Sequence, residues 1–172
     1  MINKDGLHII KAGPEDAEAI IEYLNIIGGE SDNLLFGKGE FNLSVKQEQS
    51  FISGINNSAN SIMLLGKVNG EIVSVSSLSG YSKARIAHRG EIAISVKKSF
   101  WGQGFGTAMM KELIKFGKET AKLEVIQLEV KSDNEKAIHL YENLGFVKIG
   151  TYKKFFKINN KYYDAYLMNL YL

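Results

Sequence analysis

A glycine-rich turn that joins an apolar strand pattern to an amphipathic helix pattern constrains the fold of this chain most. Residues 91–96 read EIAISV, residues 101–106 read WGQGFG, and a helix is predicted from about 104 to 121. Three alternating glycines let the backbone approach a ligand closely. Free N–H groups at the start of a helix suit an anionic group. The stretch therefore predicts a binding site for phosphate.

Two other phosphate-binding loops share part of this pattern, and the sequence counts against both. A dinucleotide fold requires G-x-G-x-x-G, but Thr107 stands where the third glycine belongs. A predicted hairpin meander also leads into the turn, where a dinucleotide fold would begin its parallel sheet. A P-loop requires Gly-Lys-Ser/Thr, which this turn lacks. The glycines alone do not identify the ligand.

Hydrophobic periodicity along the chain predicts an α/β fold with seven strands and four helices. The predicted strands are residues 8–11, 61–68, 71–78, 86–96, 123–130, 146–156 and 163–172. The predicted helices are residues 14–28, 44–55, 104–121 and 134–144. Asn69-Gly70 between two strands is a strong hairpin signal. The strand, helix, strand order after residue 86 implies locally parallel pairing. Residues 30–42 read as an ordered loop of the kind that borders substrate pockets.

Composition narrows the class of protein. With 172 residues, 45% hydrophobic and 23% charged, the chain is expected to form a single globular domain over residues 1–172. A net charge of +2 from scattered Lys and Arg gives no case for a nucleic-acid partner. No apolar run is long enough for a bilayer or a signal peptide, so no membrane partner and a cytoplasmic location are expected.

Cysteine and histidine usage bears on catalysis and metal binding. The chain has no cysteine, which excludes disulfides, thiolate metal sites and a cysteine nucleophile. The three histidines, His8, His88 and His139, are scattered without metal-ligand spacing. We therefore expect no metal.

Two motifs at the proper separation resemble those of the GCN5-related N-acetyltransferase (GNAT) family, and the resemblance covers nearly the whole chain. Val96, four intervening residues and residues 101–106 match the family's acetyl-CoA motif. The second motif is matched by Asn134, Ala137, Leu140, Tyr141, Gly145 and Phe146. The chain looks similar to bacterial members that act on small amines, amino-acid-like compounds or protein N-termini, including phosphinothricin-type and ribosomal-protein acetyltransferases.

The resemblance implies a fold and a cosubstrate. The expected fold is a mixed, mostly antiparallel central sheet of six to seven strands, with helices on both faces. A splayed cleft would open between the strand of Glu91 and the strand that begins near Leu123. The family's cosubstrate is acetyl-CoA, and the backbone of Ile94, Ser95 and Val96 would pair with its pantetheine arm. The other implied cofactor-binding residues are Trp101, Gly102, Gln103, Gly104, Phe105, Gly106, Thr107, Asn134 and Tyr141. Trp101 is a departure, because the family usually has Gln or Arg there.

The resemblance also implies catalytic roles. Tyr141 is the expected general acid, and a phenol with an ordinary pKa of about 10 keeps its proton at neutral pH. Glu129 is the expected general base, with Glu91 as the runner-up, although many relatives use water chains instead. Because cysteine is absent, we expect direct acetyl transfer to a primary amine in a ternary complex.

The acceptor and the assembly are the least constrained features. Glu30-Ser31 sits where phosphinothricin-type relatives carry a similar acidic-hydroxyl pair, so both are candidate substrate-binding residues. The acceptor would be a small-molecule amine or a peptide N-terminus. The apolar strand AYLMNLYL at the end of the chain would suit a homodimer. The competing hypothesis is a non-catalytic acyl-CoA-binding regulatory module.

Overall fold

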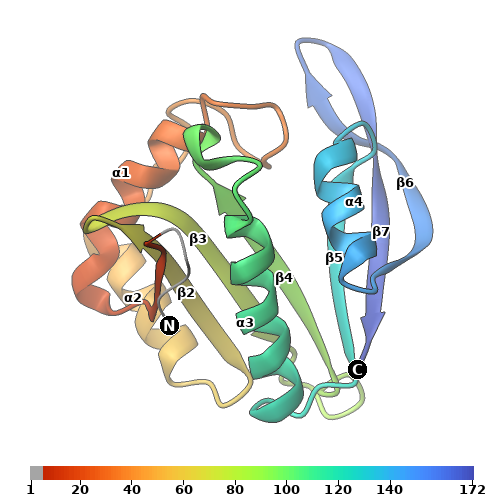
Figure 1. The fold of residues 1–172 in the computed structure, drawn as a ribbon, viewed down its shortest axis with the longest axis horizontal. Coiled ribbons are helices and arrows are strands. Elements are labelled where there is room, and N and C mark those ends of the chain that lie inside the picture. Colours follow the sequence, from red (N-terminus) through yellow and green to blue (C-terminus); the bar gives the residue numbers. More distant parts are fainter. Residues whose placement is uncertain (1–5) are drawn as a thin grey trace.

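Seven strands form one sheet in the order β1-β2-β3-β4-β5-β7-β6 (Figure 1). The computed structural model describes residues 6–172. Every pair of neighbouring strands is antiparallel except β4 and β5, which are parallel. The mostly antiparallel sheet is thereby confirmed. The strands are β1 (His8–Lys11), β2 (Ser61–Val68), β3 (Glu71–Gly80), β4 (Arg89–Val96), β5 (Val125–Lys131), β6 (Val147–Ile158) and β7 (Lys161–Tyr171).

Helices cover both faces of the sheet, as expected (Figure 1). On one face, α1 and α2 bury Ile20 and Ile52 against Leu65 of β2. On the other face, α3 and α4 pack over β3, β4 and β5, where Leu113 meets Ile126. The helices are α1 (Ala17–Ile27), α2 (Val45–Asn56), α3 (Phe105–Glu119) and α4 (Glu135–Asn143), with short 3-10 helices η1 (Pro14–Asp16) and η2 (Lys98–Phe100). The longest described helix, α3, has 15 residues, fewer than the roughly 20 that a bilayer requires.

Local signals explain where several elements begin and turn. The side chains of Ser44 and Gln47 each accept a hydrogen bond from the other's backbone N–H, which caps α2 as predicted. Asn69 and Gly70 have positive φ angles of 50° and 84°, the conformation that a two-residue hairpin needs. The predicted hairpin between β2 and β3 is therefore confirmed.

Some predicted boundaries were wrong. Strand β4 begins at Arg89 rather than at residue 86, because Ile86 donates to Lys83 and Arg89 donates to Ile86 in consecutive turns. The apolar letters of this segment therefore belong to a turn. The β6–β7 hairpin is longer than predicted, since strand pairing continues to Ile158 and Lys161 around the positive-φ pair 159–160.

The parallel pair β4 and β5 stays together over a short distance only. Arg89, Gly90 and Glu91 pair with residues 125–127, and no pairing between the two strands follows within the described chain. Beyond Glu91 the strands part, while β4 continues to Val96 beside β3. The predicted splay between these two strands is confirmed.

Candidate active site

A cavity of about 890 Å³ lies where β4 and β5 part. Its walls come from β3, β4, the glycine turn, the first turn of α3, β5 and α4. The loop after α1 and residues 155–156 of β6 complete the lining. Residues of the glycine-rich motif, of the second motif and of the predicted loop at residues 30–42 therefore line one cavity.

The strand edge at this cavity carries free backbone groups. Lys97 donates its N–H to the carbonyl oxygen of Val73 on β3 at 2.9 Å. Backbone groups along a strand point alternately to either side, so those of Ile94 and Val96 point away from β3, toward the opening. The Ser95 side chain instead contacts α1, since Tyr23 Oη donates to Ser95 Oγ at 3.2 Å. The edge offers the backbone groups of Ile94 and the N–H of Val96 to a ligand, since the Val96 carbonyl accepts from Trp101.

The glycine turn has the geometry of an anion cradle. Gly102 and Gly104 have positive φ angles of 75° and 82°, and no atom lies within 4 Å of a Cβ built on either residue. Within residues 6–172, no backbone carbonyl accepts from the N–H groups of residues 102–107. These groups lie at the positive end of α3. A diphosphate fits this chemistry.

Two side chains of the turn hold the turn itself. Trp101 Nε1 donates to the carbonyl oxygen of Val96 at 2.7 Å, and Gln103 Nε2 donates to that of Ser99 at 2.9 Å. Neither contact was predicted from the sequence. The sequence does not indicate which group an indole N–H will contact. The acceptor of Trp101 is set by the path that the backbone takes through the folded turn.

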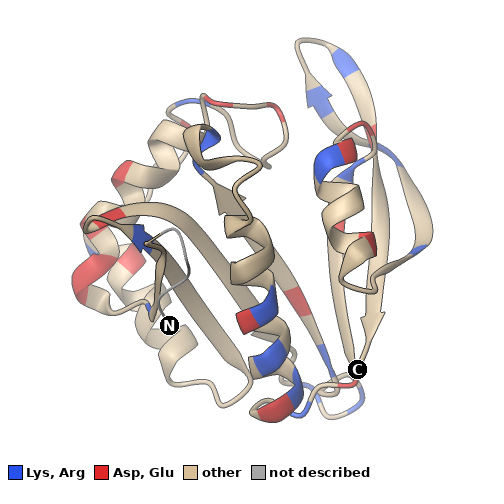
Figure 2. Ribbon diagram, viewed as in Figure 1, with Lys and Arg blue, Asp and Glu red and all other residues tan. Residues whose placement is uncertain are grey.

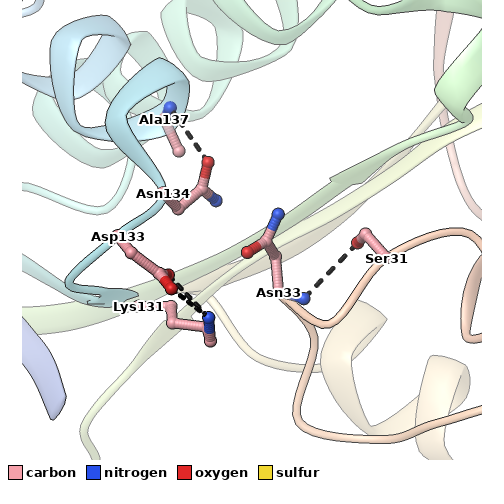
Figure 3. Close-up of polar contacts among 6 residues, drawn as sticks. All are labelled: Ser31, Asn33, Lys131, Asp133, Asn134 and Ala137. Atoms are coloured by element: carbon pink, nitrogen blue, oxygen red, sulfur yellow. Dashed lines mark hydrogen bonds and ion pairs between the residues drawn. The ribbon is translucent and has the colours of Figure 1, made fainter. Parts of the chain in front are cut away.

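Close packing joins α3 to α4 beside the cavity. A Cβ on Gly106 would lie 3.1 Å from Leu140 Cδ1, so the bare glycine allows this approach. Asn134 caps α4, because its Oδ1 accepts from the N–H of Ala137 at 3.4 Å (Figure 3). Asn134 and Tyr141 both line the cavity.

Tyr141 is buried, with 8% of its surface exposed, and its ring lies 5.9 Å from that of Phe146. Burial raises the pKa of the Tyr141 phenol to about 12. The phenol therefore holds its proton at neutral pH. A group in this state can donate a proton to a basic leaving group.

Two carboxylates, Glu91 and Glu129, line the cavity from β4 and β5. Tyr81 Oη donates to Glu91 Oε2 at 3.3 Å. Burial, followed by the negative charge of Glu91, raises the pKa of Glu129. A carboxylate with a raised pKa is a stronger proton acceptor than an ordinary glutamate, which suits Glu129 to the role of a base.

Glu30 and Ser31 also line the cavity, but both make local contacts. Glu30 Oε2 accepts from the N–H of Lys98 at 2.6 Å, at the start of η2. The N–H of Asn33 donates to Ser31 Oγ at 3.4 Å (Figure 3). The loop after α1 is thus tied to the segment that precedes the glycine turn, a contact across 68 residues that sequence reasoning missed.

The described residues contain no group of three or more potential metal ligands among His, Cys, Asp and Glu. His8, His88 and His139 lie in β1, in the turn before β4 and in α4. None of the three lines the cavity.

Comparison with known proteins places these features in a family context. The model of the acetyltransferase (GNAT) family matches residues 35–146. An L-amino acid N-acetyltransferase of Escherichia coli is 30% identical over 105 residues, which are 61% of this chain and 65% of that protein. An N-alpha-acetyltransferase of Mycobacterium tuberculosis is 33% identical over 75 residues, 44% of each chain. The matched regions thus cover less than two thirds of either relative.

Among solved structures, a GNAT-family acetyltransferase from Streptococcus pneumoniae superimposes with a TM-score of 0.93. The two chains are 29% identical, and the match covers 96% of this chain and 99% of the other. The overall fold therefore recurs in a known structure of this family.

Proposed function

This chain belongs to the acetyltransferase (GNAT) family, whose model matches well over half of its length, and from this premise we propose that it transfers an acetyl group from acetyl-CoA to a primary amine. The acceptor is a small-molecule amine or a peptide N-terminus. The observation that carries the proposal is one cavity that connects a cradle of free N–H groups to an unpaired strand edge and to two carboxylates.

The residues present fit acetyl-CoA. The cradle at residues 102–107 would hold the diphosphate through backbone N–H groups, which explains why Trp101 can replace the usual Gln or Arg. The free edge of Ile94 and Val96 would hold the pantetheine arm, and Asn134 would contact it from α4. When bound, acetyl-CoA supplies an acetyl thioester at the meeting point of these elements.

Acid and base roles follow from the protonation states. Glu129 accepts a proton from the acceptor's ammonium group, directly or through water, and so frees the nitrogen lone pair. The nitrogen forms the new C–N bond as the C–S bond breaks, and the nitrogen then releases its second proton to solvent. Glu129 passes the first proton to solvent as well. Tyr141 gives its proton to the departing sulfur and regains one from solvent. Transfer is direct, because the chain has no cysteine and no other acyl-enzyme nucleophile is indicated.

Thiol release from acetyl-CoA, measured with a panel of amines, amino acids and N-terminal peptides, tests the proposal. The expected result is turnover with at least one acceptor. No turnover, together with a melting temperature that CoA still raises, would indicate the non-catalytic acyl-CoA-binding module instead. A covalent acetyl-enzyme trapped with radiolabelled acetyl-CoA would contradict direct transfer.

A further inference from the structure

Two carboxylates share one face of the sheet at the cavity. Glu91 pairs in register with Gln127, and Glu129 lies two residues further along β5, so the side chains of Gln127 and Glu129 point to the same side. Leu128 points to the opposite side and packs in the core under α3 and α4. The carboxylates therefore lie on the side of α1 and α2, away from the glycine turn's helix.

Basic side chains on that face are already engaged. Arg89 donates to Gln127 and lies 5.9 Å from the centre of the Tyr81 ring. Lys131 Nζ lies 2.6 Å from both carboxylate oxygens of Asp133 (Figure 3) and 3.8 Å from the centre of the Tyr163 ring. Neither Arg89 nor Lys131 lines the cavity.

Within residues 6–172, Lys136 is the one Lys or Arg that lines the cavity. It stands in the first turn of α4, beside Asn134 and Ala137. Because Asn134 is the proposed contact to acetyl-CoA, we assign Lys136 to the cofactor side. A carboxylate on the acceptor would therefore enter the other side without a cationic partner, at a high cost in desolvation.

The β6–β7 hairpin carries several lysines (Figure 2), and none of them lines the cavity. Lys154 and Lys157 lie 5.2 and 5.6 Å from the centre of the Tyr162 ring. Neither lysine lines the cavity, whereas Phe155 and Phe156 of the same strand do. The hairpin therefore presents aromatic side chains to the cavity.

Apolar side chains contribute much of the acceptor side, beside the polar Ser31 and Asn33. Leu24 and Ile27 of α1 line it, as do Leu34 and Phe36 of the following loop and Phe155 of β6. Such walls suit methylene groups.

From this juxtaposition of two carboxylates and apolar side chains, with Lys136 of α4 as the one Lys or Arg of residues 6–172 at the cavity, we propose that the acceptor is an aliphatic diamine or polyamine. One amino group gives its proton to Glu129 and reacts, while a second ammonium group pairs with Glu91, whose carboxylate is held by the Tyr81 hydroxyl. The inference rests on the proposed acetyltransferase function and adds the acceptor class.

Three acceptors built on the same five-carbon chain test it with the full protein and acetyl-CoA. Cadaverine has two amino groups, lysine adds a carboxylate to the same skeleton, and pentylamine lacks the second amino group. We expect kcat/KM for cadaverine to exceed that for lysine at least about 100-fold and that for pentylamine about tenfold, since a charge-assisted contact contributes roughly 1.5–3 kcal/mol.

A variant separates the role of Glu91 from a general loss of activity. Glu91→Gln should bring the cadaverine to pentylamine ratio of kcat/KM close to one. Glu119→Gln removes the same charge at the exposed end of α3, outside the cavity, and should keep the wild-type ratio.

The possible outcomes separate the proposed diamine class of acceptor from the proposed acetyltransferase function. Turnover of lysine, another amino acid or an N-terminal peptide at or above the rate for cadaverine would overturn the diamine class and leave the acetyltransferase function standing. Equal turnover of pentylamine and cadaverine would show that the second ammonium group does not contribute to recognition of the acceptor. No turnover with any acceptor would overturn both.

Discussion

The indole of Trp101 and the carbonyl of Val96 form a hydrogen bond of 2.7 Å that closes the glycine turn onto the end of β4. The N–H of the next residue, Lys97, is held by Val73 on β3. The strand end is thus fixed from both sides at the point where cofactor binding is proposed. The indole of Trp101 thus makes a contact that shapes the backbone of the turn.

Trp101→Phe keeps an aromatic ring and removes the donor. We expect the Kd of acetyl-CoA to rise about fivefold, because one hydrogen bond contributes about 1 kcal/mol. Isothermal titration calorimetry measures it. Gln103→Met, which removes the other side-chain contact in the turn, gives a comparison. An unchanged Kd in Trp101→Phe would show that the indole contact does not shape the site.

Tyr141→Phe should lower kcat by about 100-fold, in the range expected for loss of a general acid. The Kd of CoA should stay within about twofold, because the ring still packs against Phe146. Since burial raises the pKa of Tyr141 to about 12, its ionisation should not lower kcat below about pH 10. An unchanged kcat would remove Tyr141 as the acid.

The pH dependence of kcat/KM tests Glu129. Burial and the charge of Glu91 raise the pKa of Glu129, so activity should rise with pH through a midpoint above the ordinary glutamate value of 4.5. Glu91→Gln removes the neighbouring charge and should move that midpoint to lower pH. If Glu129→Gln retains the same acid limb, then another group is the base.

Glu30 is tested by two substitutions that separate a structural from a substrate-binding role. Glu30→Gln keeps an oxygen acceptor for the N–H of Lys98, whereas Glu30→Ala removes it. If the contact serves the turn, Glu30→Ala should raise the KM of acetyl-CoA several-fold and Glu30→Gln should change it little. A higher amine KM in Glu30→Gln, with the KM of acetyl-CoA unchanged, would favour the substrate-binding role instead.

Glu48 of α2 should destabilise the fold at neutral pH. Its side chain is 1% exposed, its Oε2 has no hydrogen-bond partner among the described residues, and burial raises its pKa above 4.5. The folded state thus binds this proton more tightly than the unfolded state does. The penalty is absent below about pH 4.5 and grows as pH rises through the folded pKa.

Glu48→Gln should therefore raise Tm at pH 7 by about 2–4 °C, for a gain of about 1 kcal/mol, and the gain should shrink toward pH 4. Differential scanning fluorimetry across pH measures this. Glu22→Gln, on the exposed side of α1, should show no such pH dependence. A constant gain at every pH would mean that ionisation of Glu48 is not the cause.

Local sequence signals predicted much of the fold because they act over few residues. Ser44 with Gln47 and Asn69 with Gly70 each determine a cap or a turn by themselves. The start of the strand predicted at residue 86 was wrong, because Ile86 lies in a turn. A single apolar residue does not distinguish a strand from a turn.

The motif pair also predicted which segments surround the cavity, since Gly104 and Tyr141 both line it. The hydrogen bonds that fix the shape of the site could not be predicted from the sequence. Glu30 meets Lys98 only after α1 and β4 have docked, and Trp101 reaches Val96 only through the turn's backbone path. Burial of Glu48 likewise depends on how α2 packs against α1, which its own helix pattern does not specify.

The short pairing of β4 with β5 divides the sheet along a seam. Three residue pairs join a half made of β1–β4 to a half made of β5–β7, and the cavity occupies the rest of the boundary. A pantetheine arm bonded to the free edge of β4 would act as a missing strand across this boundary. The cosubstrate would then hold the two halves of the sheet together as well as react. The sheet would become more rigid when acetyl-CoA binds and less rigid when CoA leaves.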